Sequence, residues 1–114
     1  MKYYITTLIF RISIPEEKYP QFDEQIRLIE AEDGMQAYEK ARLIGLHEEE
    51  QFVSAQGRSI GWNFIDITNI FEIANFTDGA ELYSYTSEPE NESQYLALIR
   101  EKANALKNRF SEPV

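Results

Sequence analysis

The sequence predicts an α+β fold, built from an antiparallel, curled sheet of about five strands with a helix packed on one face and an amphipathic helix at the C-terminus. Three observations predict it: segments of alternating apolar residues, Gly-containing turns between neighbouring segments, and two stretches with apolar residues at helical spacing. The expected order is β-β-α-β-β-β-α. Strands joined by hairpins pair antiparallel, so the helices are expected to gather beside the sheet rather than alternate with its strands.

The longest apolar and aromatic run, residues 57–74, is the strand around which the sheet is expected to form. Its apolar residues start on one parity and then change to the other: Ile60, Trp62 and Phe64, followed by Ile65, Ile67, Phe71 and Ile73. A change by one residue is typical of a β-bulge, which bends a strand while keeping its apolar side inward. Two strands broken near Phe64–Asp66 are the alternative. One long bent strand is favoured, because no Gly or Pro lies between Trp62 and Ala74.

Two strands that pair as a hairpin are predicted at the beginning of the chain. The first, residues 3–14, is apolar on both faces near its N-terminal end, so both faces are expected to be covered there. The second, residues 22–31, is expected to point Phe22, Ile26 and Leu28 inward and Asp23, Gln25 and Arg27 outward. Pro15 and Pro20 cannot join a ladder and therefore bracket the connecting loop.

A helix is predicted to begin after Asp33. The Asp33 side chain can cap the N-terminus, and Gln36 completes a capping-box pattern. The apolar stripe is dominated by small residues, so the helix can lie close to the sheet; it consists of Ala37, Tyr38, Ala41, Ile44 and Gly45. Gly45 is also expected to end the helix.

Two further strands complete the expected core domain, residues 1–86. A short strand at residues 51–55 leads through the Gln56-Gly57 turn into the long strand. The Asp78-Gly79 turn then leads to a last strand at residues 80–86.

Residues 87–114 are expected to form a polar linker, residues 87–94, and a C-terminal helix capped by Asn91. The helix carries an apolar seam of Leu96, Ile99, Ala103, Leu106 and Phe110, flanked by the basic residues Arg100, Lys102, Lys107 and Arg109. A helix of this length is marginal alone, so it is expected to dock. It can dock on its own domain or on a partner subunit. A homodimer is favoured here because the basic edges of the helix complement the acidic rest of the chain, because Met35, Leu43 and Leu46 lie off the buried stripe of the first helix, and because two-fold dimers are common.

Composition indicates one folded domain that needs no cofactor. The chain is 43% hydrophobic, with no cysteine and one histidine, so neither a disulfide nor a metal site is expected. Residues 1–90 hold seven Lys/Arg and 17 Asp/Glu, a net −10, whereas residues 91–114 hold four and three, a net +1. This acidic body disfavours nucleic acid and would suit a basic protein partner, although solubility alone explains most acidic proteins. No segment is expected to span a membrane, and a cytoplasmic location is predicted.

The chain resembles a small bacterial family, domain of unknown function 4288. The motifs that carry the resemblance are Ile29-Glu30-Ala31-Glu32, a helix ending Ile44-Gly45, Trp62-x-Phe64-x-x-Ile67 and Asp78-Gly79-x-Glu81-Leu82-Tyr83-Ser84. They extend over roughly residues 2–86 and leave the C-terminal helix outside. The resemblance implies a bacterial source and a small stand-alone domain, and it supplies no activity.

No catalytic, cofactor-binding or metal-binding residues are predicted. Aromatic residues that include Trp62, Tyr83 and Tyr85 would line a ligand pocket if the sheet curls around them, although a filled core is the more usual outcome for such residues. Asp66 and Arg11 are the candidate polar anchors of such a pocket. The sequence thus favours a non-enzymatic interaction module, either a homo-oligomer or a binder of a basic protein. A small ligand-binding or enzymatic domain around Trp62 is the alternative.

Overall fold

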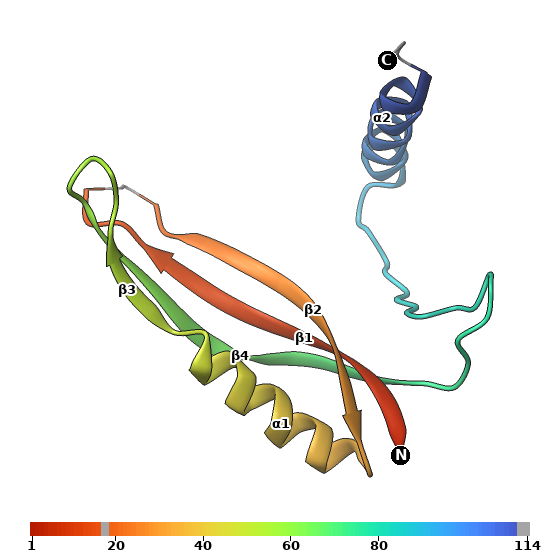
Figure 1. The fold of residues 1–114 in the computed structure, drawn as a ribbon. Coiled ribbons are helices and arrows are strands. Elements are labelled where there is room, and N and C mark those ends of the chain that lie inside the picture. Colours follow the sequence, from red (N-terminus) through yellow and green to blue (C-terminus); the bar gives the residue numbers. More distant parts are fainter. Residues whose placement is uncertain (17–18, 112–114) are drawn as a thin grey trace. The chain divides into compact units, whose positions relative to one another are not determined.

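The computed structural model describes residues 1–16 and 19–111. The chain divides into two compact units, Met1–Ser84 and Tyr85–Val114. The first unit contains β1 (Lys2–Ser13), β2 (Gln21–Ala31), α1 (Gly34–His47), β3 (Glu50–Val53) and β4 (Ser59–Ile73). The second contains α2 (Glu92–Ser111). Within the first unit, α1 lies along one face of the sheet (Figure 1).

The four strands form one antiparallel sheet in the order β2-β1-β4-β3, which confirms the α+β class and the curled antiparallel sheet. The predicted fifth strand at residues 80–86 is wrong, because that segment is not a strand. A turn does form, with the Ala80 N–H donating to the Thr77 carbonyl at 3.0 Å. After it, however, the chain lies across the sheet, where Tyr83 packs its ring against Phe71.

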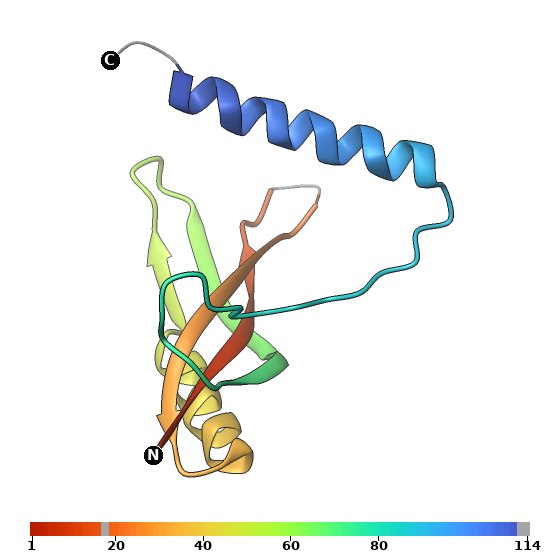
Figure 2. The same cartoon turned by 90° about the vertical axis from the view of Figure 1, so that its right-hand side faces the viewer.

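Two bulges bend β4 where it pairs with β1. Ile9 faces Asp66 while Phe10 faces Phe64, which leaves Ile65 as an extra residue on β4. This confirms one long strand with a bulge near Phe64–Asp66. A second register shift leaves Thr68 as an extra residue on β4, because Thr7 faces Asn69 while Leu8 faces Ile67. Bulges increase local twist, and Figure 2 shows the strongly twisted strands.

The second bulge was not predicted, and it changes which β4 residues share a face. Ile67 packs against the core between the sheet and α1. Phe71 and Ile73 lie on the other face, opposite Ile5 and Tyr3 of β1. A second parity change therefore follows Ile67. The expectation that Ile67, Phe71 and Ile73 share a face is wrong.

The core lies between α1 and the face of the sheet formed by the even-numbered residues of β1. Leu8 and Phe10 are fully buried there, and the small residues Ala37, Ala41 and Gly45 of α1 are buried against them. Trp62, Phe64, Ile67, Ile70 and Ile44 are partly buried and pack against the same cluster. The predicted small-residue stripe of the helix is thus confirmed.

The sequence predicted the beginning of α1 correctly but not its end. The Asp33 carboxylate caps the helix by accepting the Gln36 N–H at 2.8 Å, and the Gln36 side chain accepts the Glu32 N–H at 2.6 Å. The prediction that Gly45 ends the helix is wrong, because α1 continues to His47 with Glu48 as its C-cap. Gly45 instead allows close packing: a Cβ there would lie 2.8 Å from Cγ of Phe64.

The inward face of β2 was also predicted wrongly. Phe22, Ile26 and Leu28 are exposed on the face away from α1, whereas Ile29 and Ala31 are buried in the core. Because β1 is apolar on both faces, the alternation in β2 does not reveal which face is covered. The connection decides it, since α1 begins at Gly34, three residues after Ala31, and covers the face on which Ala31 lies.

Gly45→Ala is expected to destabilise the protein by about 1–3 kcal/mol, because the added methyl group overpacks the contact with Phe64. Gly34→Ala is the matched control: its Cβ would meet nothing within 4 Å, so the free energy of unfolding should be unchanged or slightly raised. Urea midpoints of the two variants provide the measurement. Equal midpoints would contradict the close packing of α1 on β4.

Trp62→Ala is expected to lower the free energy of unfolding by about 2–3 kcal/mol, less than a fully buried aromatic residue would lose, because Trp62 is half-buried. Tyr85→Ala, at an exposed position in the second unit, should change it by no more than about 0.5 kcal/mol. A small effect of both substitutions would show that Trp62 does not support the core.

Candidate functional site

The face of the sheet away from α1 presents side chains from three adjacent strands, and we call it the open face. Odd-numbered residues of β1 form its centre, flanked by even-numbered residues of β2 on one side and by residues of β4 on the other. Going along β1, cross-strand rows follow one another: Glu30, Tyr3 and Ile73; Leu28, Ile5 and Phe71; Ile26, Thr7 and Asn69; Glu24, Ile9 and Asp66; Phe22, Arg11 and Asn63. On β4 this face therefore changes from apolar residues near Tyr3 to polar residues near Arg11, whereas β2 carries both apolar and acidic residues along it.

The end of the open face near Tyr3 is covered by the segment after β4. The ring of Phe76 packs edge-on against Tyr3 with 5.1 Å between centroids, and Tyr83 packs edge-on against Phe71 at 5.0 Å. Between them Ile5 is buried, with 8% of its surface exposed. The exposed Tyr3 hydroxyl donates a hydrogen bond to the Glu30 carboxylate, and this bond raises the pKa of Tyr3 above its ordinary value. The negative charge of Glu30 raises it further.

The β2 side of the open face is bare. Phe22, Ile26 and Leu28 are exposed by 61%, 67% and 57%, and they lie on one parity of one strand. We call these three residues the β2 patch. Single exposed apolar residues are ordinary, but an aligned set on an uncovered sheet face is typical of an interaction surface.

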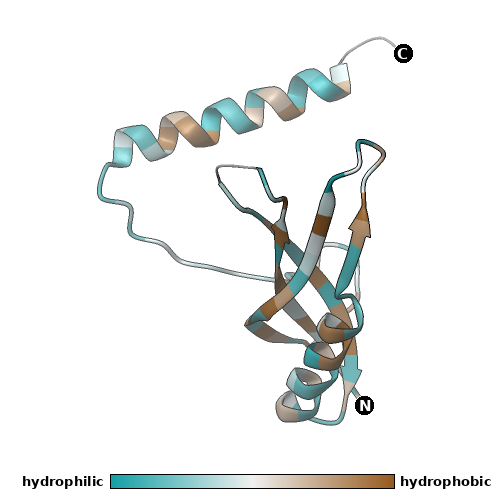
Figure 3. Ribbon diagram, turned by 90° about the vertical axis from the view of Figure 1, so that its left-hand side faces the viewer, coloured by the Kyte–Doolittle hydropathy of each residue, from teal (hydrophilic) through white to brown (hydrophobic). Residues whose placement is uncertain are grey.

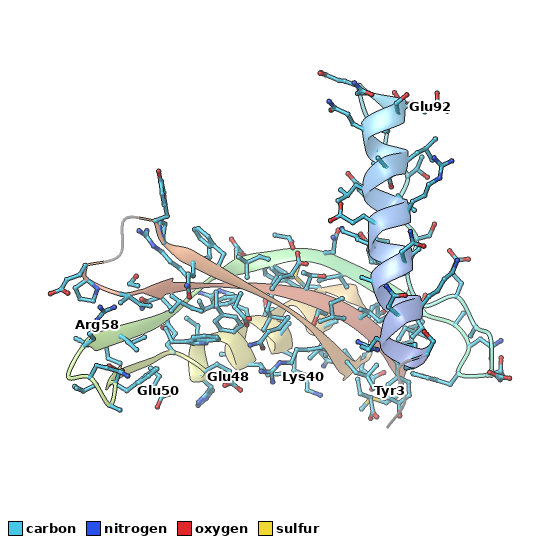
Figure 4. All side chains as sticks on the ribbon, turned by 90° about the horizontal axis from the view of Figure 1, so that it is seen from above. Tyr3, Lys40, Glu48, Glu50, Arg58 and Glu92 are labelled. Atoms are coloured by element: carbon cyan, nitrogen blue, oxygen red, sulfur yellow. The ribbon has the colours of Figure 1, made fainter. Side chains whose placement is uncertain are left out.

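The opposite end of the open face contains a polar cleft of about 460 Å³, which lies between β1, β4, β3 and the loop after β1. Its polar lining consists of Arg11, Ser13, Gln51, Ser59 and Asn63, and its apolar rim of Ile14, Pro15 and Pro20. No carboxylate is among the described residues that line it. In Figure 4, Arg58, next to Ser59, lies at this end of the sheet and Tyr3 at the other.

Strand register explains why these polar residues meet. Arg11 pairs with Asn63, and Ser13 pairs with Gly61, which in turn pairs with Gln51 on β3. Directly paired residues point to the same face, so the side chains converge over Gly61. Without a side chain, Gly61 leaves the floor of the cleft open: a Cβ there would lie 3.3 Å from Oδ1 of Asn63 and 3.7 Å from Cβ of Ser13.

The candidate site residues predicted from sequence are distributed over different places. Trp62 faces α1 and packs on Phe10 with 5.5 Å between ring centroids. Arg11 and Asp66 lie on the open face, the opposite side of the sheet from Trp62, and Asp66 accepts the Ile67 N–H at 2.8 Å. Of the other two, Tyr83 packs on Phe71 and Tyr85 is exposed in the second unit. The structure therefore does not bring Trp62 and Arg11 together.

Sequence reasoning missed the partners of Arg11. One signal was available: Gly61 stands inside a strand pattern, where glycine often marks a position that a ligand or another chain approaches closely. The residues of the β2 patch were predicted to face the core, whereas they lie on the open face.

The second unit presents the apolar seam on α2. The predicted cap is present, with Asn91 Oδ1 accepting the Gln94 N–H at 3.0 Å. None of the residues of α2 is buried, and apolar segments alternate with polar ones along it in Figure 3. The large seam residues Leu96, Ile99, Leu106 and Phe110 are exposed. Arg109 lies over the ring of Phe110, with 4.7 Å between its Cζ and the ring centroid.

Across the described residues, no group of three or more His, Cys, Asp or Glu side chains is placed to hold a metal ion. No helix in this part of the chain has the length and apolar character that crossing a membrane requires.

Comparison with known proteins identifies the first unit. The curated proteins and the solved structures gave no match. The family model described as Domain of unknown function (DUF4288) matches residues 3–84, which contain the whole sheet from Tyr3 onward, α1 and the aromatic cover of the open face, and leave out α2. Because this match extends over most of the chain, the protein belongs to the DUF4288 family.

Proposed function

We propose that this protein is a non-enzymatic, cytoplasmic interaction module that forms a homodimer, in which α2 of each copy packs on the open face of the other. The observation that supports it is the presence of two exposed apolar surfaces in one chain, the β2 patch and the α2 seam. Exposure of either apolar surface to water is unfavourable, and the helix seam and the sheet face can cover each other.

The two surfaces agree in length. The seam runs from Leu96 to Phe110, 14 residues on, which corresponds to about 21 Å at 1.5 Å per helical residue. The β2 patch runs from Phe22 to Leu28, six residues on, or about 20 Å at 3.3 Å per strand residue. One helix can therefore contact all three residues of the patch.

Charge also favours this pairing. The four basic residues of α2 flank its seam on both sides, namely Arg100, Lys102, Lys107 and Arg109. Residues 1–84 hold seven Lys/Arg and 15 Asp/Glu, a net −8, and Glu24 and Glu30 lie on β2 between and beside the patch residues. Complementary charge of this kind orients partners and raises association rates.

The connection between the units is long enough for α2 to reach the open face of a second copy. Tyr83 lies on Phe71, and two strand spacings, about 10 Å, separate β4 from β2. Residues 85–91 extend to about 23 Å at ~3.3 Å per residue. They contain Pro89, Glu88 and Glu90, and proline and like charges keep linkers extended. A linker of this length allows α2 to reach its own sheet or the sheet of a second copy.

A basic protein is the second candidate partner, favoured by the net −8 of residues 1–84. The same acidity disfavours direct binding to nucleic acid, because phosphate contacts dominate that affinity. A non-enzymatic role is supported by the chain chemistry, since one histidine and no cysteine offer few ways to activate a nucleophile.

Sedimentation of the full chain tests the dimer. The expected mass is twice 13.3 kDa, and Leu106→Glu in the seam should weaken association about a hundredfold, because a carboxylate would be buried without a partner. Ile26→Glu in the β2 patch should have the same effect. Asn104→Glu, on the polar side of α2, is the matched control and should leave the dimer intact.

Mixing the two weakened variants distinguishes exchange from self-docking. Ile26→Glu retains an intact helix and Leu106→Glu an intact patch, so the mixture should form a dimer held by one intact contact. A full chain that remains monomeric at high concentration would contradict the proposal, and α2 would then cover its own sheet. Monomers that bind anionic vesicles would contradict it as well.

A further inference from the structure

We propose that the polar cleft around Arg11 binds a small oxyanion-bearing ligand, a carboxylate or a phosphate. This inference does not depend on the dimer, since the cleft is formed by β1, β3, β4 and the loop after β1. Of the β2 patch, only Phe22 is a direct neighbour of Arg11, and it does not line the cleft. Its volume of about 460 Å³ is in the range of small-molecule sites.

The charge of Arg11 is available to a ligand. The Arg11 guanidinium has no ion-pair or hydrogen-bond partner among the described residues, and its neighbours in the cross-strand row are Phe22 and Asn63. Lys2 and Arg27, by contrast, pair with Glu72 at 3.5 Å and Glu48 at 3.3 Å. A guanidinium left without a carboxylate in so acidic a chain is placed to receive one from elsewhere.

The other polar groups of the cleft are suited to an oxyanion. Ser13 and Ser59 carry hydroxyl donors, and Gln51 and Asn63 carry amide donors. These groups come from three different strands, so the ladder holds their backbones in position. Carboxylate and phosphate sites usually combine a guanidinium with two or three further hydrogen-bond donors.

Gly61 supports the presence of a ligand independently. Glycine inside a strand weakens it, and here no positive φ explains the choice. A Cβ at Gly61 would project into the floor of the cleft beside Ser13 and Asn63. The missing side chain therefore leaves space where an oxyanion would contact the serine and the amide.

Titration of the isotope-labelled full chain with inorganic phosphate, and separately with succinate, tests the proposal by amide chemical shifts. We expect saturable shifts confined to the cleft, including the side-chain amides of Gln51 and Asn63. Arg11→Gln should weaken binding at least about tenfold, because a charge-assisted pair is lost. Arg42→Gln removes the same charge from an exposed position on α1 and is the matched control.

Gly61→Ala provides a variant that changes no charge. It should weaken binding of the preferred anion while the melting temperature stays the same or rises, since alanine favours a strand more than glycine does. Preference for phosphate over succinate, or the reverse, identifies the ligand class. Absence of saturable shifts with both anions, or equal losses in Arg11→Gln and Arg42→Gln, would overturn the proposal. Repeating the titration with Ile26→Glu separates it from the dimer, because that variant should still bind.

Discussion

The pairing of β1 with β4 is the constraint on which the rest of the structure depends. β4 uses two more residues than β1 does over the same ladder, Ile65 and Thr68. Each extra residue bends and twists the strand, so the sheet curls along its length. α1 can follow the curled face only by approaching it closely, which the buried Ala37, Ala41 and Gly45 permit.

Much of the fold could be predicted from sequence because its signals are local. Asp33 caps α1, Asn91 caps α2, and the parity change after Phe64 marks a bulge; each depends on a few neighbouring residues. The wrong predictions concern which parts of the chain pack against each other. Alternation in β2 is the same whichever face is covered, and residues 80–86 are apolar enough for a strand yet pack Tyr83 across the sheet instead.

The candidate site was predictable in part, for the same reason. Arg11 stands out as a charge in an apolar strand, but its partners Ser13, Gln51 and Asn63 come from separate strands, and only their register brings them together. The predicted pocket combined Trp62 with Arg11 or Asp66 on the concave side of a curled sheet. Their opposite positions on the sheet follow from the alternation of β1 and β4 and from the register between them.

The bulges have a consequence for solubility. β3 pairs only with Ser59–Trp62, so in the described part of the chain the rest of β4 has one side of its backbone outside any ladder. Regular edges of this kind recruit further strands and lead to aggregation. Both bulges fall within this stretch, where they break the even spacing of N–H and C=O groups that an incoming strand requires. The irregularity that curls the sheet thus also disfavours the addition of a further strand along this part of β4.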